Sequence, residues 1–278
     1  AGCDGVTRIE LSSNVQSIGL LAFVGCESLK EVILPEGIKQ IDNTAFCACL
    51  RLEKINVPST VDFISDRLFC NCWNLKKIIL SQGLLKIGRA SFDGCSKLEN
   101  VTINDGVKTI GNSAFAECKS LKSIVIPDSV NLIKNSAFEN CESLTTVELS
   151  KNLKEINGST FYYCPKLKEI TIPDTVLIMS ESSFYGCSSL KSLILPDSIL
   201  QFDKINLYGC TSLESLYVMP KTPPKMYSQY TSGRDFNCGL KNIYVPEESI
   251  DIYKEDSSWK TYSEFIKAYD FENDKVVD

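Results

Sequence analysis

Residues 114–136 read AFAECKSLKSIVIPDSVNLIKNS, and this stretch of 23 residues is the unit from which most of the chain is built. The pattern returns at intervals of 23 residues, without an insertion, across nine copies. Eight copies carry a phenylalanine at its second position, and the ninth carries a leucine: Phe23, Phe46, Phe69, Phe92, Phe115, Phe138, Phe161, Phe184 and Leu207. A strict period of this length is the sequence signature of a repeat architecture.

Two more positions of the unit are invariant along the chain. The residue three places after each phenylalanine position is a cysteine: Cys26, Cys49, Cys72, Cys95, Cys118, Cys141, Cys164, Cys187 and Cys210. The residue three places further on is always a leucine, from Leu29 to Leu213. If the units stack in phase, each position forms a ladder of like side chains through the molecule.

Each unit contains one short strand and one turn. The segment Leu-x-x-Ile-x-Ile alternates with a period of two, which is typical of a strand with one inward face. A proline such as Pro127 follows in most copies, and it ends the strand because it cannot donate to a continuing ladder. Serines two places before the phenylalanine predict the cap of a short helical turn: Ser113, Ser136, Ser159 and Ser182.

One unit is too small to bury its own apolar face, so the copies must stack. Stacked copies pair their strands in parallel at about 4.8 Å and bury continuous ladders of Phe, Cys, Leu and Ile. The repeat therefore predicts a solenoid rich in strands.

The combination of Leu-x-x-Ile-x-Leu-Pro, Ala-Phe-x-x-Cys and the 23-residue period resembles the BspA-like, Treponema-type class of leucine-rich repeats. This resemblance implies a right-handed, arc-shaped α/β solenoid, with a parallel sheet on its concave side and short helical turns or irregular structure on its convex side. It also implies a bacterial or protozoal protein at the cell surface or secreted, active in adhesion and without catalytic residues in the repeat.

The repeat also predicts how the chain is divided. Residues 1–218 form about nine and a half coils, beginning inside a repeat because Cys3 is in phase with Cys26. This start suggests a solenoid trimmed within a coil; the alternative is that Cys3 is the acylated residue of a lipoprotein. Residues 219–278 form a Pro-rich excursion, a last strand and a helical C-terminal cap that carries Trp259, Phe265 and Ile266.

Composition excludes several function classes. The 278 residues contain no histidine, which removes imidazole bases and His-ligated metal sites. Only carboxylates or a thiolate could support an enzyme, and no spacing sets two carboxylates facing each other, so we expect no catalysis and no cofactor. The net charge is −6 without a run of basic residues, which argues against nucleic acid, and no stretch is long enough to span a membrane.

Thirteen cysteines raise the question of disulfides and metals. Ten are in ladder phase, where we expect buried thiols that act as small hydrophobic side chains. Cys47 and Cys70 are additional, and three alternatives remain open for them: free thiols, a bridge between the two, or a four-thiolate zinc site with Cys49 and Cys72. We expect no metal site.

Two surfaces are candidates for binding. The first is the row of outward strand residues on the concave face, especially Ile33, Ile79, Val125, Ile194 and Tyr217. The second is the set of tyrosines that directly follow the ladder position in three successive coils, Tyr162, Tyr185 and Tyr208. The alternatives are that β-branched residues simply favour strands and that the tyrosines stack on one another. Lys30, Glu53, Lys76, Glu99 and Lys122 alternate in sign and should stabilise the sheet.

Together these features predict a monomeric, non-catalytic binding or adhesion module that presents an extended surface to a host or cell-surface protein or to a glycan, without nucleic acid and without membrane insertion. The alternative is a structural spacer within a larger surface protein.

Overall fold

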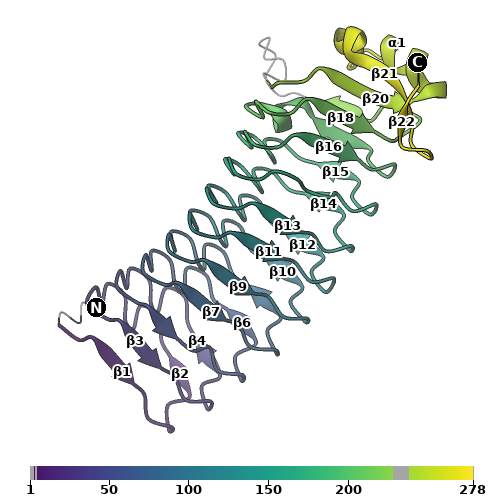
Figure 1. The fold of residues 1–278 in the computed structure, drawn as a ribbon. Helices are drawn as coiled ribbons and strands as arrows, with labels where there is room; N and C mark the ends of the chain where they lie inside the picture. The colour runs from purple at the N-terminus through teal and green to yellow at the C-terminus, as the bar shows by residue number, and fades with distance from the viewer. Residues whose placement is uncertain (1–2, 4, 228–237, 278) are drawn as a thin grey trace.

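A computed structural model describes residues 3, 5–227 and 238–277 of the chain. The coils stack one upon another from the N-terminal end to a small cap at the C-terminal end (Figure 1). The second half of the predicted Pro-rich excursion lies outside the described residues.

A first sheet runs along one side of the stack, as the Leu-x-x-Ile-x-Ile pattern predicts. Its strands pair in parallel with a register shift of 23 residues, so that Ile9 lies beside Val32 and Val32 beside Ile55. The strands are β1 (Arg8–Glu10), β3 (Glu31–Ile33), β5 (Lys54–Ile55), β7 (Lys77–Ile79), β9 (Asn100–Thr102), β11 (Ser123–Val125), β13 (Thr146–Glu148), β16 (Ser192–Leu195), β18 (Ser215–Val218) and β20 (Asn242–Pro246).

A second sheet of very short strands runs along another side. Each strand carries one buried residue of a further apolar ladder, such as Ile87 beside Ile110. The strands are β2 (Ser17–Ile18), β4 (Gln40–Ile41), β6 (Phe63–Ile64), β8 (Lys86–Ile87), β10 (Thr109–Ile110), β12 (Leu132–Ile133), β14 (Glu155–Ile156), β15 (Ile178–Met179), β17 (Gln201–Asp203) and β19 (Lys225–Tyr227). The sequence does not predict this sheet, because two residues are too few for an alternation to be read.

The remaining side of each coil consists of turns that carry the phenylalanine ladder. Neighbouring rings stack with centroids 5.2–6.0 Å apart. The prediction that serines cap a helical turn here is wrong: Ser113, Ser136, Ser159 and Ser182 lie in turns with φ of 53–59°, whereas a cap residue is extended. Hydrogen bonds between coils hold these turns, since the N–H of Phe115 donates to the carbonyl of Ala137 at 2.8 Å. The convex side is therefore irregular.

The cysteine ladder is bound to the phenylalanine ladder. Eight thiols, from Cys49 to Cys210, donate to the carbonyl oxygen of the phenylalanine 26 residues earlier at 3.2–3.3 Å. A cysteine is small enough for this packed position and supplies a donor for a carbonyl that water cannot reach. Burial raises the pKa of these thiols, as at Cys118 and Cys141.

The C-terminal cap is only partly helical. It contains η2 (Glu247–Ser249), α1 (Ile250–Glu255) and η3 (Lys260–Phe265), while η1 (Lys204–Leu207) lies in an earlier coil. The Tyr253 hydroxyl donates to the carbonyl of Pro220 at 2.7 Å, and the Trp259 Nε1–H donates to that of Pro224 at 2.9 Å. The expected helical position of Ile266 is wrong, because Ile266 begins β21 (Ile266–Asp270), which pairs in parallel with β20 and antiparallel with β22 (Lys275–Val276).

Truncation of one ladder ring should destabilise the solenoid strongly. Phe115 is fully buried, with its ring 5.2 Å from Phe92 and 5.5 Å from Phe138. Phe115→Ala should lower the free energy of unfolding by about 3–5 kcal/mol, measured by urea denaturation. The exposed control Ser123→Ala should change it by less than about 0.5 kcal/mol. Equal effects of the two substitutions would contradict the packed ladder.

Alkaline pH should destabilise the fold through the thiol ladder. The pKa of buried thiols such as Cys118 is raised above its ordinary value of 9.0, so the folded state retains protons that the unfolded chain releases. The free energy of unfolding should therefore be constant below about pH 9 and fall above it, by up to about 1.4 kcal/mol per pH unit for each such thiol. Urea denaturation at about pH 8 and pH 9.5 measures this. The decrease should be smaller in Cys118→Ala, and an equal decrease would refute the assignment to thiols.

Candidate interaction surface

Four of the five residues of the first candidate row are exposed on the outer face of the first sheet. The exposed fractions of Ile33, Ile79, Val125 and Ile194 are 36%, 63%, 56% and 50%. The first three stand in alternate coils, so they are separated by two strand spacings, or about 10 Å. Rigid strands thus present apolar side chains to solvent at a regular interval.

Tyr217 differs from the rest of this row. Its ring stacks on Tyr244 with centroids 4.9 Å apart and meets the edge of Tyr269 at 5.1 Å. Tyr269 in turn packs on Phe271 at 5.0 Å. Burial raises the pKa of the half-buried Tyr217 hydroxyl. The structure thus places Tyr217 in an aromatic cluster at the C-terminal end, where it joins the last coils to the cap.

The second candidate, the tyrosine trio, forms a stack of its own. The Tyr162 and Tyr185 rings, and the Tyr185 and Tyr208 rings, lie 4.9 Å apart and within 20° of parallel. All three side chains are half-buried. This is the mutual stacking that the sequence left open as the alternative to a binding role.

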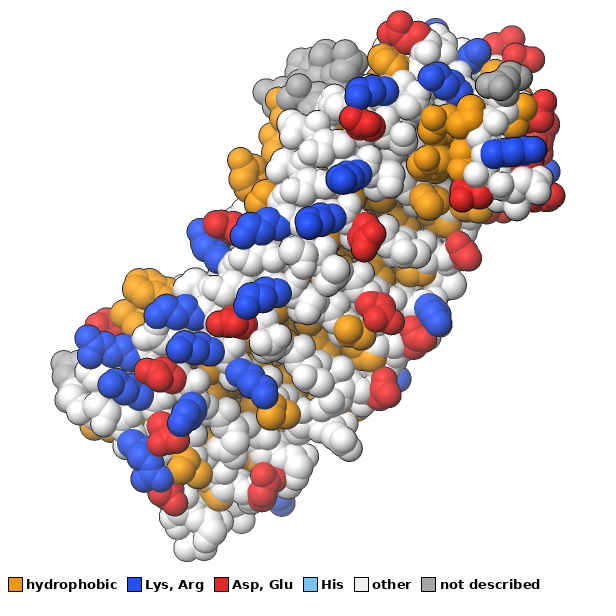
Figure 2. All heavy atoms as spheres, in the orientation of Figure 1, with side chains coloured by type: hydrophobic (Ala, Val, Ile, Leu, Met, Phe, Trp, Pro, Cys, Tyr) orange, Lys and Arg blue, Asp and Glu red, His pale blue; other side chains and the backbone are white. Residues whose placement is uncertain are grey.

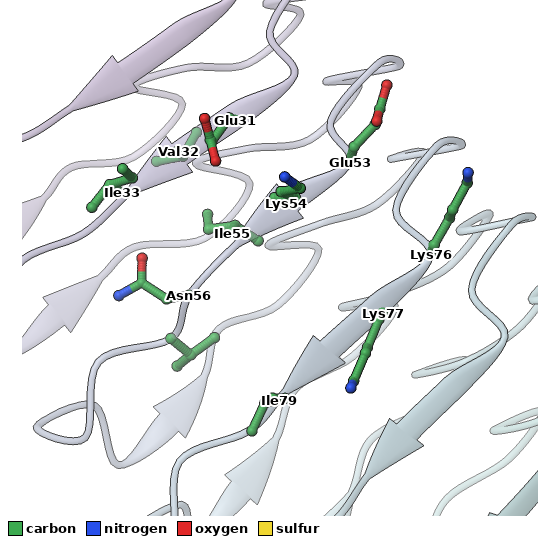
Figure 3. A pocket seen from close by; sticks show the side chains of 11 residues that line it. Glu31, Val32, Ile33, Glu53, Lys54, Ile55, Asn56, Lys76, Lys77 and Ile79 are labelled. Atoms are coloured by element: carbon green, nitrogen blue, oxygen red, sulfur yellow. The ribbon is translucent and has the colours of Figure 1, made fainter.

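An open depression of about 910 Å³ lies at the N-terminal end of the first sheet. Ile33, Asn56 and Ile79 line it where the strands end, and Lys54, Lys77 and the strand-entry residues line the other side (Figure 3). Asn56 stabilises the sheet here: its amide nitrogen donates to the carbonyl of Leu34 at 2.8 Å and its oxygen accepts from the Leu34 N–H at 2.9 Å.

The alternating charges do not form the expected ladder. Of Lys30, Glu53, Lys76, Glu99 and Lys122, only the last two make an ion pair in the described part of the chain, at 3.2 Å. Sequence reasoning looked for runs of basic residues and missed this group, because the fold brings together lysines that are 23 residues apart. The signal was the sign of each residue at one repeat position.

The four cysteines of the possible zinc site do not converge. Cys49 and Cys72 donate to the carbonyls of Phe23 and Phe46, and Cys70 donates to the Asp93 carboxylate at 4.0 Å. Burial, followed by the neighbouring Cys47, raises the pKa of Cys70 to about 12. Within the described residues, no three Cys, Asp or Glu side chains gather as metal ligands, and all thirteen cysteines are free thiols.

A parallel-sheet solenoid of 23-residue coils with an invariant leucine ladder defines the class of leucine-rich repeat proteins. Residues 1–122 and 108–230 match the BspA type leucine rich repeat region in six copies, and the chain belongs to this family. A comparison with curated proteins gives no match.

Solved structures with this fold come from several bacteria. A leucine-rich repeat protein from Bacteroides ovatus is 24% identical, with a TM-score of 0.53 over 97% of this chain and 85% of the other. The leucine rich repeat protein of T. pallidum is 27% identical, with a TM-score of 0.52 over 66% of this chain and 77% of the other. A leucine rich cell surface protein from Faecalibacterium prausnitzii is 24% identical, with a TM-score of 0.44 over 78% and 74%.

Family and fold together make this chain a repeat-based protein-interaction module. Repeats of this family are typically non-catalytic. In the part of the chain that the structure describes, no helix is both long and apolar enough to cross a bilayer.

Counting thiols tests the open alternatives for Cys47 and Cys70. Under denaturing, non-reducing conditions we expect all thirteen cysteines to react with a thiol reagent, because all are free. A count of eleven, restored to thirteen by reductant and unchanged in the double variant Cys47→Ser/Cys70→Ser, would establish the bridge between these two residues. Added zinc should not lower the count, whereas protection of four thiols by zinc would favour the metal site.

Proposed function

We propose that this protein is a non-catalytic binding or adhesion module, at the cell surface or secreted, that presents the outer face of its first sheet to a host or cell-surface protein or to a glycan. The carrying observation is the exposure of Ile33, Ile79, Val125 and Ile194 at a regular interval. Apolar side chains on a rigid sheet lose little conformational entropy when a partner covers them. An extended partner fits such a row better than a small metabolite does.

The tyrosine stack is the second candidate surface. Its rings are already packed against each other, so a partner would contact mainly their edges. The involvement of Tyr217 in the aromatic cluster and of Asn56 in the sheet favours a second function, that of a structural spacer, because both residues stabilise the fold rather than await a ligand.

The experiment begins with an array of cell-surface proteins and glycans, probed with the protein. For any partner found, Ile79→Thr/Val125→Thr should weaken the affinity at least about tenfold, because two exposed apolar contacts are lost. The melting temperature should hardly change, since neither side chain packs in the interior and threonine also favours strands. The matched control is Leu85→Thr/Leu132→Thr, the same kind of change at exposed positions of the second sheet.

The control pair should leave the affinity unchanged. Loss of binding in Tyr185→Ser/Tyr208→Ser, with no loss in Ile79→Thr/Val125→Thr, would move the site to the tyrosine stack. If no partner binds, or if neither pair affects binding, the module proposal fails in favour of the spacer.

A further inference from the structure

A group of cations lies where the chain enters the strands of the N-terminal coils. We call it the basic edge; it consists of Lys30, Arg51, Lys54, Lys76, Lys77 and Lys97. All six side chains are exposed, and none has a carboxylate within 4.0 Å in the described part of the chain. Figure 2 shows Lys and Arg side chains gathered over these coils. The whole chain carries a net charge of −6, so this surface opposes the charge of the rest.

The carboxylates of the same edge do not neutralise it. Glu31 already pairs with Arg8 at 3.2 Å, and Glu99 pairs with Lys122 at 3.2 Å. Only Glu53 remains unpaired among the six cations. Lys54 and Lys77 occupy neighbouring strands, about 4.8 Å apart, and like charges at that separation destabilise a sheet. Stability therefore does not account for the basic edge, and a negatively charged partner does.

The basic edge borders the depression that Ile33 and Ile79 line on its other side (Figure 3). A ligand seated here meets ammonium groups along one flank and two exposed apolar side chains along the other. These two side chains lie two coils apart, at about 10 Å. That spacing corresponds to every third residue of an extended chain or every seventh residue of a helix.

We propose that the depression binds an acidic protein segment whose apolar side chains recur at about 10 Å. The acidic groups contact Lys54, Lys76 and Lys77, and the apolar groups cover Ile33 and Ile79. This inference rests on the proposed function and names the chemistry of its partner. Its electrostatic part makes association dependent on ionic strength.

The observations favour a protein over a nucleic acid or a sulfated glycan. The unpaired Glu53 lies between Lys30 and Lys76 at one position of the repeat, where it repels a uniform polyanion but accepts a lysine or arginine of a protein segment. No aromatic side chain is among the residues that line the depression, all of which the structure describes, so bases and sugar rings have nothing to stack on.

The test uses the full chain and a fluorescein-labelled synthetic peptide of five Glu-Glu-Leu repeats, read by fluorescence anisotropy. The variant Lys54→Glu/Lys76→Glu/Lys77→Glu should raise the dissociation constant at least about tenfold. The matched control Lys39→Glu/Lys86→Glu/Lys108→Glu makes the same change of net charge outside the basic edge and should change it less than about twofold. Raising the salt concentration from about 50 to 200 mM should weaken binding to the unchanged protein. Both variants are first checked for an unchanged melting temperature.

Three results would overturn the inference. The first is an equal loss of affinity in both triple variants or no binding of the peptide. The second is equal affinity for a peptide of Glu-Glu-Ser repeats, which removes the role of the apolar side chains. The third is tighter binding of heparin or of a single-stranded oligonucleotide, displaced by neither peptide. A partner from the array that depends on Ile79 and Val125 but not on the three lysines would refute this inference and leave the proposed function intact.

Discussion

Stacking of coils in register, at a fixed interval of 23 residues, is the constraint on which the rest of this structure depends. Each thiol of the cysteine ladder donates to a phenylalanine carbonyl of a neighbouring coil, and each phenylalanine ring stacks on the next. A coil with one residue more or less would break both ladders at once. The absence of any insertion from Phe23 to Leu207 is the sequence counterpart of this packing.

This constraint also determines what the surface can do. Every outward position repeats at the strand spacing of about 4.8 Å, whichever side chain it carries. Residues 23 positions apart in the sequence become neighbours, so single substitutions at one repeat position build rows of charge or of apolar groups. The basic edge and the row from Ile33 to Ile194 are two such rows. Their chemistry varies freely because neither row packs in the interior.

Predictability follows the same division. The solenoid, the first sheet and the buried ladders could be predicted, because Phe115, Cys118 and Ile124 occupy invariant positions whose periodicity reports packing. The serine caps could not, since the left-handed φ of Ser113 arises from hydrogen bonds to the next coil and not from local preference. The second sheet escaped for a similar reason, as two-residue strands carry no alternation.

The candidate site was less predictable than the fold, and Tyr217 shows why. The repeat gives it the same outward position as Ile194, yet the cap supplies Tyr244 and Tyr269 as neighbours and removes it from the exposed row. The period thus predicts where a side chain points but not what lies beyond it. The same limit applies to the lysines: alternating signs at one position suggested ion pairs, but exposed side chains lose conformational entropy on pairing and gain little in water. Most of them stay apart, which leaves the N-terminal coils with the positive charge that an acidic partner can neutralise.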